Sequence, residues 1–144
     1  MDRQLQQLIE NSPDAILVTD REGKILYWNT GAERMFGYSA AEALGQSLDI
    51  IIPENLRARH WDGYYRVMET GQTKYTTDML TSPGMHKDGS RISLEFSIVL
   101  LRNENGKIDG CASVMRDVTA RWNKEKALKK QLADCQSKLT PHAG

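Results

Sequence analysis

The chain has 144 residues, of which 40% are hydrophobic, and its 19 basic side chains balance 19 acidic ones. That length fits one domain with a core of its own. A neutral chain gives no electrostatic reason to expect nucleic acid or an anionic membrane as the main partner. The longest apolar run is interrupted by Asp49 and is far too short to cross a bilayer, so we expect no membrane insertion.

The cysteines and the N-terminal residues predict the cellular compartment of the protein. Cys111 and Cys135 lie in unlike contexts, and neither belongs to a CxxC pair. Isolated cysteines are typical of a reducing compartment, in which thiols stay free. The first residues are not followed by an apolar signal segment. We therefore expect a cytoplasmic location.

The first third of the chain predicts a helix, a hairpin and two further helices. Leu5, Leu8 and Ile9 recur at helical spacing, which indicates an amphipathic N-terminal cap helix. Glycines and polar turn residues bound the segments that follow, and Ser39 suits the N-cap of the last one. The expected elements are the cap helix at 3–10, strands at 15–20 and 25–28, and helices at 29–36 and 40–44.

The next part of the chain predicts one long helix and three strands. Pro53 suits the first turn of a helix and Gly71 suits its C-terminal stop, so we expect a helix over 53–70. Asp-Gly at 88–89 and Asn-Gly at 105–106 are strong hairpin signals. The expected strands are 73–80, 91–101 and 108–116. Strands at both ends with helices between them predict an α+β fold with an antiparallel sheet.

The pattern changes from residue 118 onward. Leu128, Leu132, Cys135 and Leu139 recur at intervals of four, three and four residues, with lysines beside them. This spacing is typical of a two-stranded coiled coil, and the alternative is a helix packed back on its own sheet. We expect a homodimer through this helix. The expected organisation is a cap helix at 1–10, a domain at 11–119, and a C-terminal helix at 120–144 that is cut short.

Five segments occur in a fixed order along the chain, at 20–29, 32–38, 42–46, 87–90 and 115–119. The first reads D-R-E-G-K-I-L-Y-W-N and the last reads M-R-D-V-T. Together, over roughly 5–120, they resemble the PAS family of sensory domains. The resemblance implies a five-stranded antiparallel sheet with short helices over one face, enclosing a pocket, and a signal-input module that is not an enzyme. In that family the Asp117-Val118-Thr119 position passes the signal into an output helix.

His60 is the candidate ligand for a metal cofactor. It lies within R-A-R-H-W-D-G-Y-Y-R, which resembles the axial-histidine helix of haem-binding PAS domains of the FixL oxygen-sensor type. The spacing from His60 to Asp88-Gly89 fits that subfamily without a gap. A neutral imidazole is a good axial ligand for haem iron. The resemblance therefore implies b-type haem bound through His60, without covalent attachment because no CxxCH motif is present.

The same register implies further cofactor-binding residues: Tyr64, Arg66, Tyr75, Met79, Leu80, Phe96 and Ile98. Arg66 matches a position near the haem propionates. Leu80 stands where the oxygen sensors have an arginine that hydrogen-bonds bound oxygen. Among the diatomic gases, an apolar distal wall suits CO or NO better than O2, unless Tyr75 supplies the missing donor. Met79 is one residue from the position where some haem sensors provide a second axial ligand.

Two other kinds of PAS domain stay open on the sequence alone. A redox sensor with non-covalent FAD fits the same resemblance, whereas a flavin–cysteine light sensor does not, because 29–70 contains no cysteine. The other alternative is a ligand-free dimerisation module, in which His60 is structural. The chain carries no catalytic motif with supporting context. We expect catalysis in a downstream output domain, such as a histidine kinase or a cyclic-dinucleotide enzyme.

Overall fold

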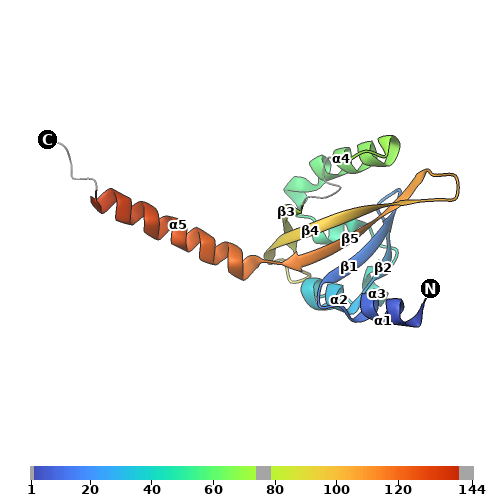
Figure 1. Ribbon diagram of the computed structural model, residues 1–144, viewed down its shortest axis with the longest axis horizontal. Helices are drawn as coiled ribbons and strands as arrows, with labels where there is room; N and C mark the ends of the chain where they lie inside the picture. The colour runs from blue at the N-terminus through green and yellow to red at the C-terminus, as the bar shows by residue number, and fades with distance from the viewer. Residues whose placement is uncertain (1, 74–78, 140–144) are drawn as a thin grey trace.

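The computed structural model describes residues 2–73 and 79–139. Within them, five strands form one antiparallel sheet in the order β2-β1-β5-β4-β3, and a long helix leaves the sheet after β5 (Figure 1). The strands are β1 (Ala15–Asp20), β2 (Ile25–Trp28), β3 (Leu80–Met85), β4 (Arg91–Arg102) and β5 (Ile108–Asp117). The helices are α1 (Arg3–Asn11), α2 (Thr30–Phe36), α3 (Ala40–Ala43), α4 (Arg57–Thr70) and α5 (Thr119–Leu139), with 3-10 turns η1 (Leu48–Ile51) and η2 (Glu54–Leu56). The predicted α+β fold with an antiparallel sheet is confirmed.

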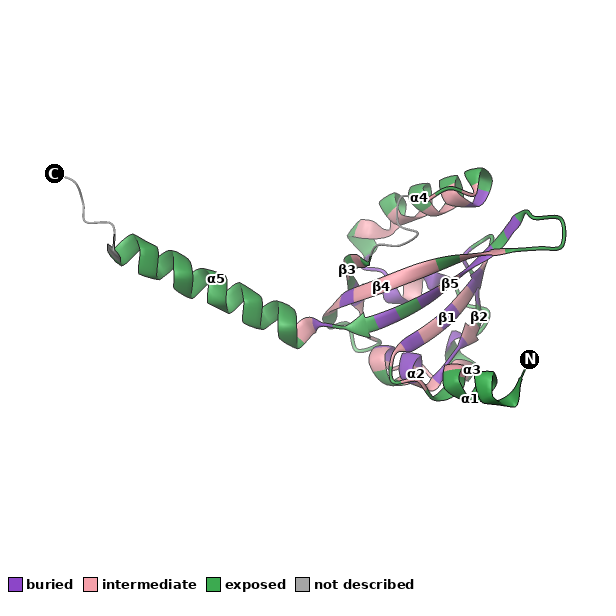
Figure 2. Ribbon diagram, viewed as in Figure 1, coloured by how far each residue is buried: buried purple, intermediate pink, exposed green. Residues whose placement is uncertain are grey.

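The main core lies between one face of the sheet and the segment that contains α2, α3 and η1. Alternate residues of the central strands point to this inner face, where Leu17 of β1 and Met115 of β5 are buried. Trp28 and Phe36 belong to the same cluster, with ring centroids 5.5 Å apart. Burying one side chain of this size stabilises the fold by about 1.5–3 kcal/mol. Figure 2 shows these buried segments in purple.

Asn29 joins the elements that meet at the start of α2. Its side-chain oxygen accepts hydrogen bonds from the backbone N–H groups of Ile16 and Ala32, each at 2.9 Å. Its side-chain nitrogen donates to the carbonyl oxygens of Ile9 at 2.8 Å and Asp14 at 3.0 Å. Because Asn29 is completely buried, these bonds satisfy an amide that water does not reach. The residue therefore fixes α1, β1 and α2 relative to one another.

Local signals predicted both ends of α2 and α3, and the end of α4, to within one residue. Asn29 and Ser39 are the N-caps of α2 and α3, and Ser39 forms a capping box with Glu42. Gly37 and Gly71 end α2 and α4 in the left-handed conformation, at φ values of 82° and 68°. The helix predicted at 53–70 is corrected at its start, because η2 precedes α4 and the α-helix begins four residues later, at Arg57.

Of the described residues in the strand predicted at 73–80, Leu80 alone is in a strand. Thr73 and Met79 are not in a strand, and 74–78 lie outside the described residues. The third strand instead begins at Leu80 and includes Pro83. Because β3 is an edge strand, the missing N–H of Pro83 costs no essential ladder bond.

Helix α5 is tied to the sheet only at its first turn. The Ser93 backbone donates to the Thr119 hydroxyl at 2.9 Å and accepts from the Val118 N–H at 2.8 Å. Arg121 pairs with Glu95 of β4 at 2.5 Å. After this turn every described residue of α5 is exposed, and Figure 2 shows the helix projecting away from the sheet. None of the described helices is long and apolar enough to cross a membrane.

We predict that Asn29→Ala lowers the free energy of unfolding by about 2–4 kcal/mol, because it leaves buried backbone groups without partners. Denaturant unfolding measures this. The matched control is Asn103→Ala, since the Asn103 side chain also accepts two backbone hydrogen bonds but lies exposed in the β4–β5 turn. The control should cost less than about 1 kcal/mol. Equal losses for the two variants would show that Asn29 is an ordinary cap.

Candidate functional site

Helix α4 lies over one end of the inner face of the sheet. The Tyr64 hydroxyl is 2.9 Å from the Thr19 hydroxyl and also donates to the carbonyl oxygen of Asp20, both in β1. Burial raises the pKa of Tyr64 to about 12, so this hydroxyl stays protonated and keeps its role as a donor. One turn later, Met68 is buried in a small cluster with Ile108 of β5. These contacts hold α4 above β1 and the beginning of β5.

The inner face of β4 is only partly covered. Phe96 and Ile98 point to the same face as Met115 and Ser113, their neighbours in β5, because paired residues share a face. Met115 and Ser113 are buried, whereas Phe96 and Ile98 keep part of their surface exposed. Leu80 of β3 pairs with Phe96 on its other side and is partly exposed as well. An apolar wall of this kind can accept an apolar ligand.

His60 stands one turn before Tyr64 on α4. Its ring lies edge-on to the Trp61 ring, with centroids 4.6 Å apart, and 5.8 Å from the Tyr64 ring. The Nδ1 atom of His60 is buried, and no described residue gives it a hydrogen-bond partner. Leaving a buried polar atom unpaired costs about 1–3 kcal/mol. Such an exception calls for a physical reason, and a ring that serves as a ligand is one.

The surroundings of His60 favour its neutral form. Burial lowers the pKa of His60, and the Asp49 carboxylate opposes this effect to a smaller extent. The ring is therefore neutral near neutral pH, and neutral imidazole is the form that binds iron. Asp49 also accepts a hydrogen bond from the Trp61 indole N–H at 2.7 Å and lies 4.0 Å from the Arg57 side-chain nitrogen.

The other residues predicted for the site fall into three groups. Tyr64, Leu80, Phe96 and Ile98 belong to the inner face of the sheet or to the attachment of α4. Arg66 is exposed on α4, and Met79, just before β3, is 54% exposed. Tyr75 lies outside the described residues. The structure thus brings one group together, and the roles assigned to all of these residues stay predictions.

Asp49 and Trp61 were not identified as site residues from the sequence. Their hydrogen bond joins η1 to α4 across 12 positions of the chain, and no local pattern marks such a pair. Trp61 does follow His60 directly, so an aromatic residue beside the candidate ligand was the one available signal. The polar partners of Tyr64 in β1 were missed for the same reason, since they are 45 and 44 positions away.

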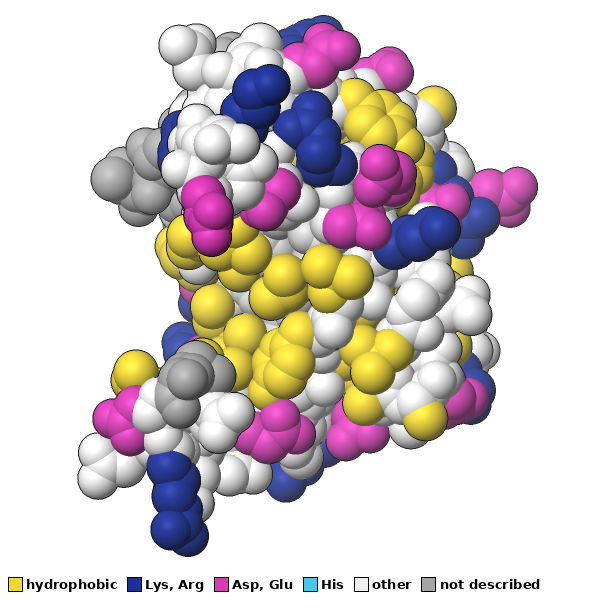
Figure 3. Space-filling view, turned by 90° about the vertical axis from the view of Figure 1, so that its right-hand side faces the viewer, with side chains coloured by type: hydrophobic (Ala, Val, Ile, Leu, Met, Phe, Trp, Pro, Cys, Tyr) yellow, Lys and Arg dark blue, Asp and Glu magenta, His cyan; other side chains and the backbone are white. Residues whose placement is uncertain are grey.

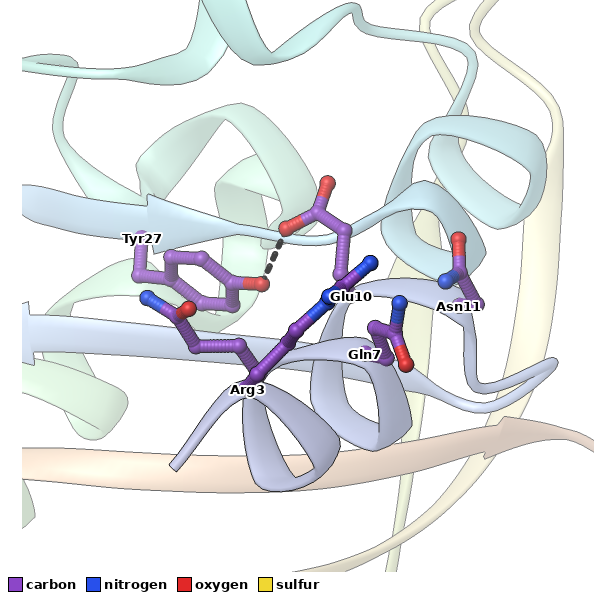
Figure 4. Close-up of a pocket in the computed structure, with 6 residues that line it drawn as sticks. Arg3, Gln7, Glu10, Asn11 and Tyr27 are labelled. Atoms are coloured by element: carbon purple, nitrogen blue, oxygen red, sulfur yellow. Dashed lines mark hydrogen bonds between the residues drawn. The ribbon is translucent and has the colours of Figure 1, made fainter. Parts of the chain in front are cut away.

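Two cavities lie elsewhere on the molecule. One of about 330 Å³ lies between α1 and β2, where Arg3, Gln7 and Glu10 approach Tyr27 (Figure 4). The Tyr27 hydroxyl donates to the Glu10 carboxylate, and the pKa of Tyr27 is raised to about 12, mainly by burial. The other cavity, about 490 Å³, is lined by η2 and the β3–β4 turn. Neither includes His60 or the partly covered side chains of β4, so neither adds to the candidate site.

His60 has no companion ligands for a bare metal ion. In the ranges 2–73 and 79–139, no three His, Cys, Asp or Glu side chains are grouped so that they could hold one. A site with one protein ligand suits an iron whose other bonds come from a porphyrin. Zinc and other ions that need several protein ligands do not fit this arrangement.

Comparison with known proteins assigns residues 3–118 to the family model described as the PAS fold. The sensor protein FixL of Bradyrhizobium diazoefficiens is 34% identical over 94 residues, which are 65% of this chain and 19% of FixL. The oxygen sensor protein DosP of Escherichia coli K12 is 29% identical over 101 residues, 70% of this chain and 12% of DosP. The crystal structure of a PAS domain from Colwellia psychrerythraea superposes with a TM-score of 0.72 at 27% identity, covering 82% of this chain and 97% of that one. The chain thus spans less than a fifth of the two curated relatives.

We predict that Tyr64→Phe loosens α4 without unfolding the sheet. The variant loses the hydroxyl that bonds to β1, and we expect the free energy of unfolding to fall by about 1 kcal/mol. Amide hydrogen exchange should rise in α4 and stay unchanged in β5. Tyr65→Phe is the matched control, because Tyr65 is the next residue on the same helix and is 49% exposed. Unchanged exchange in α4 after Tyr64→Phe would contradict this view of its attachment.

Proposed function

This chain belongs to the PAS family, and from that premise we propose that it is a sensory input domain that binds b-type haem through His60. The family consists of signal-sensing modules, and the match includes the whole sheet and α4. The signal would be a diatomic gas or a change of redox state. Catalysis would lie in another part of a longer signalling protein.

The observation that carries this proposal is the buried Nδ1 atom of His60, which is unpaired within the described residues. Folded proteins pair nearly all buried polar atoms, so an exception calls for a physical reason. This exception lies on the residue that the resemblance to haem-binding PAS domains identifies as the axial ligand. Because burial also lowers the pKa of the ring, His60 is ready to bind a metal without first losing a proton.

The inner face of the sheet suits a flat apolar cofactor. The partly exposed side chains of Leu80, Phe96 and Ile98 offer apolar surface on the inner face of the sheet. The exposed Arg66 is available to a carboxylate such as a haem propionate. Bound haem supplies an iron with a position for a diatomic ligand or for an electron. The chain contributes a neutral imidazole and an apolar wall that keeps water away.

Leu80 bears on which gas the domain would favour. It lies on the same face as Phe96 and carries no hydrogen-bond donor. A charge-assisted hydrogen bond to a bound ligand contributes about 1.5–3 kcal/mol, and a leucine cannot supply it. CO and NO depend less on such a donor than O2 does. We therefore propose that O2 is held more weakly than CO or NO.

FAD is the alternative cofactor, and a ligand-free module is the alternative without one. An apolar wall suits a flavin ring as well as a porphyrin, so the wall does not discriminate between them. A histidine at this place favours haem, because haem iron takes an axial protein ligand whereas a flavin contains no metal. Its unpaired Nδ1 atom also weighs against the ligand-free module, in which nothing would offset the cost of that nitrogen.

We predict that His60→Ala abolishes the absorption spectrum of a histidine-ligated haem and lowers haem affinity by at least about tenfold. Titration of the purified protein with haemin measures both. His86→Ala is the matched control, since His86 lies at the β3–β4 turn with its ring against Gly37, away from α4. Its haem spectrum should equal that of the wild type. An unchanged spectrum in His60→Ala would rule out His60 as the ligand.

We propose further that α5 carries the output and pairs with α5 of a second copy. The stripe predicted for a coiled coil is exposed, with Leu128 at 54% and Leu132 at 59%. Valines at 99 and 114 on the sheet and leucines at 5 and 8 on α1 are exposed as well. Figure 3 shows hydrophobic side chains gathered across the end of the molecule opposite α5, between charged ones. The exposed leucines of α5 are spaced as in a coiled coil, which favours pairing of this helix.

The contacts between the sheet and α5 can transmit a movement of the sheet to the helix. Ser93 of β4 holds Val118 and Thr119, and Glu95 of the same strand holds Arg121. Phe96 and Ile98 follow directly on that strand. A ligand that shifts β4 would therefore change the direction of α5, and repacking of two helices is a bistable element suited to signalling.

We predict that mild oxidation cross-links two copies through Cys135. In a parallel coiled coil, equivalent positions face each other across the axis, and Cys135 is exposed. Non-reducing electrophoresis should show a dimer band that Cys135→Ser removes. Cys111→Ser should leave the band in place, because Cys111 is buried and burial raises its thiol pKa. Sedimentation as a monomer at high concentration, with no cross-link, would contradict the parallel pair.

A further inference from the structure

The Trp61 ring lies directly on Gly23, in the turn between β1 and β2. A Cβ atom built on Gly23 would be 2.0 Å from Cη2 and 2.2 Å from Cζ3 of Trp61. Real Cβ atoms do not approach other atoms so closely, so the ring occupies the space that any side chain at 23 would need. The contact also covers Gly23, which is buried although it lies in a surface turn.

The surface under Trp61 is held together by backbone hydrogen bonds. The Gly23 carbonyl accepts from the Leu48 N–H at 2.9 Å, and Lys24 pairs with Ser47. Asp49, next in the chain to Leu48, accepts the indole N–H of Trp61 at 2.7 Å. The β1–β2 turn and the start of η1 thus form one support. Trp61 touches both parts of it, one through the Cη2–Cζ3 edge of its ring and one through its N–H.

His60 is the residue before Trp61 on the same helix, and the two rings are 4.6 Å apart. A helix is stiff over one turn, so a movement of Trp61 moves His60 with it. Tyr64, one turn after His60, anchors α4 to β1. The His60 ring therefore lies beside two anchored rings, and the position of the Trp61 ring depends on the missing side chain of Gly23.

We propose that Gly23 and Trp61 are positioning residues for His60: the bare Gly23 backbone seats the Trp61 ring, and this seat sets the place of the imidazole under α4. The position of the imidazole is a property of the chain without any ligand. The effect of that position on haem binding rests on the proposed function.

Gly23 has another reason to be glycine, and the test must separate the two. Its φ of +82° is in the left-handed region, where other residues are strained. Gly45 has a φ of +83° and would meet nothing within 4 Å if it carried a Cβ. Gly45→Ala therefore has the same backbone strain as Gly23→Ala and lacks the clash with Trp61. The difference between the effects of the two variants therefore measures the contribution of the contact between Trp61 and Gly23.

The experiment compares the full chain with Gly23→Ala and Gly45→Ala, by NMR before haem is added and by haemin titration afterwards. We expect Gly23→Ala to move the ring-proton resonances of His60 and the indole N–H resonance of Trp61, because ring-current shifts depend on their separation. Gly45→Ala should leave both in place. Haem affinity should fall at least about tenfold in Gly23→Ala relative to Gly45→Ala. Equal resonances and equal affinities in the two variants would overturn the proposal.

A second substitution keeps the test decisive if Gly23→Ala unfolds the chain. Trp61→Leu removes the ring that lies on Gly23 and should move the His60 resonances by itself. In that background Gly23→Ala should add no further shift and should fold as well as Gly45→Ala does, because the clash is gone. An added shift there would mean that Gly23 acts through some other contact.

The outcomes also distinguish failure of this inference from failure of the proposed function. If wild-type protein binds no haem but the His60 resonances still move in Gly23→Ala alone, the positioning holds and the cofactor is wrong. If haem binds through His60 but the two glycine variants behave alike, the proposed cofactor is right and the proposed role of Gly23 and Trp61 is wrong.

Discussion

Helix α4 meets the sheet through side chains at one end of the inner face, and this single attachment decides what the domain can hold. Tyr64 reaches β1 through its hydroxyl, and Met68 packs at the start of β5. Backbone hydrogen bonds do not join α4 to any strand in the described part of the chain. Phe96 and Ile98 of β4 consequently keep exposed apolar surface, whereas their partners Met115 and Ser113 in β5 are buried. The helices therefore leave part of the apolar inner face of the sheet uncovered.

The same attachment explains the state of His60. The helix brings the imidazole out of water, which lowers its pKa, yet provides no hydrogen-bond partner for Nδ1 among the described residues. Packing at Trp61 and Tyr64 keeps the ring there despite the cost of about 1–3 kcal/mol for an unpaired polar atom. A site that costs stability and remains in the fold is typical of function. Under the proposed function, a haem held by this histidine would cover the open wall.

Sequence reasoning succeeded where a structural signal is local. Ser39 and Gly37 mark helix ends through their own backbone preferences, and the Asn-Gly and Asp-Gly turns fixed two hairpins. It failed at β3, where a strand was predicted at 73–80 but the observed strand begins at Leu80 and continues through Pro83, which an edge strand tolerates. At the site, His60 was found by resemblance, whereas the seat of Trp61 on Gly23 was not. A glycine needed for close approach looks the same in sequence as one needed for a turn.

The central claim is that the domain uses His60 to hold haem against a partly covered sheet, and the absorption spectrum of the purified protein tests it most directly. The spectrum is recorded before and after reduction with dithionite, and again after CO is added. The account predicts a haem Soret band that shifts on reduction and shifts again with CO, as in a histidine-ligated iron. Flavin bands, or a folded protein that stays colourless after haemin is added, would contradict it.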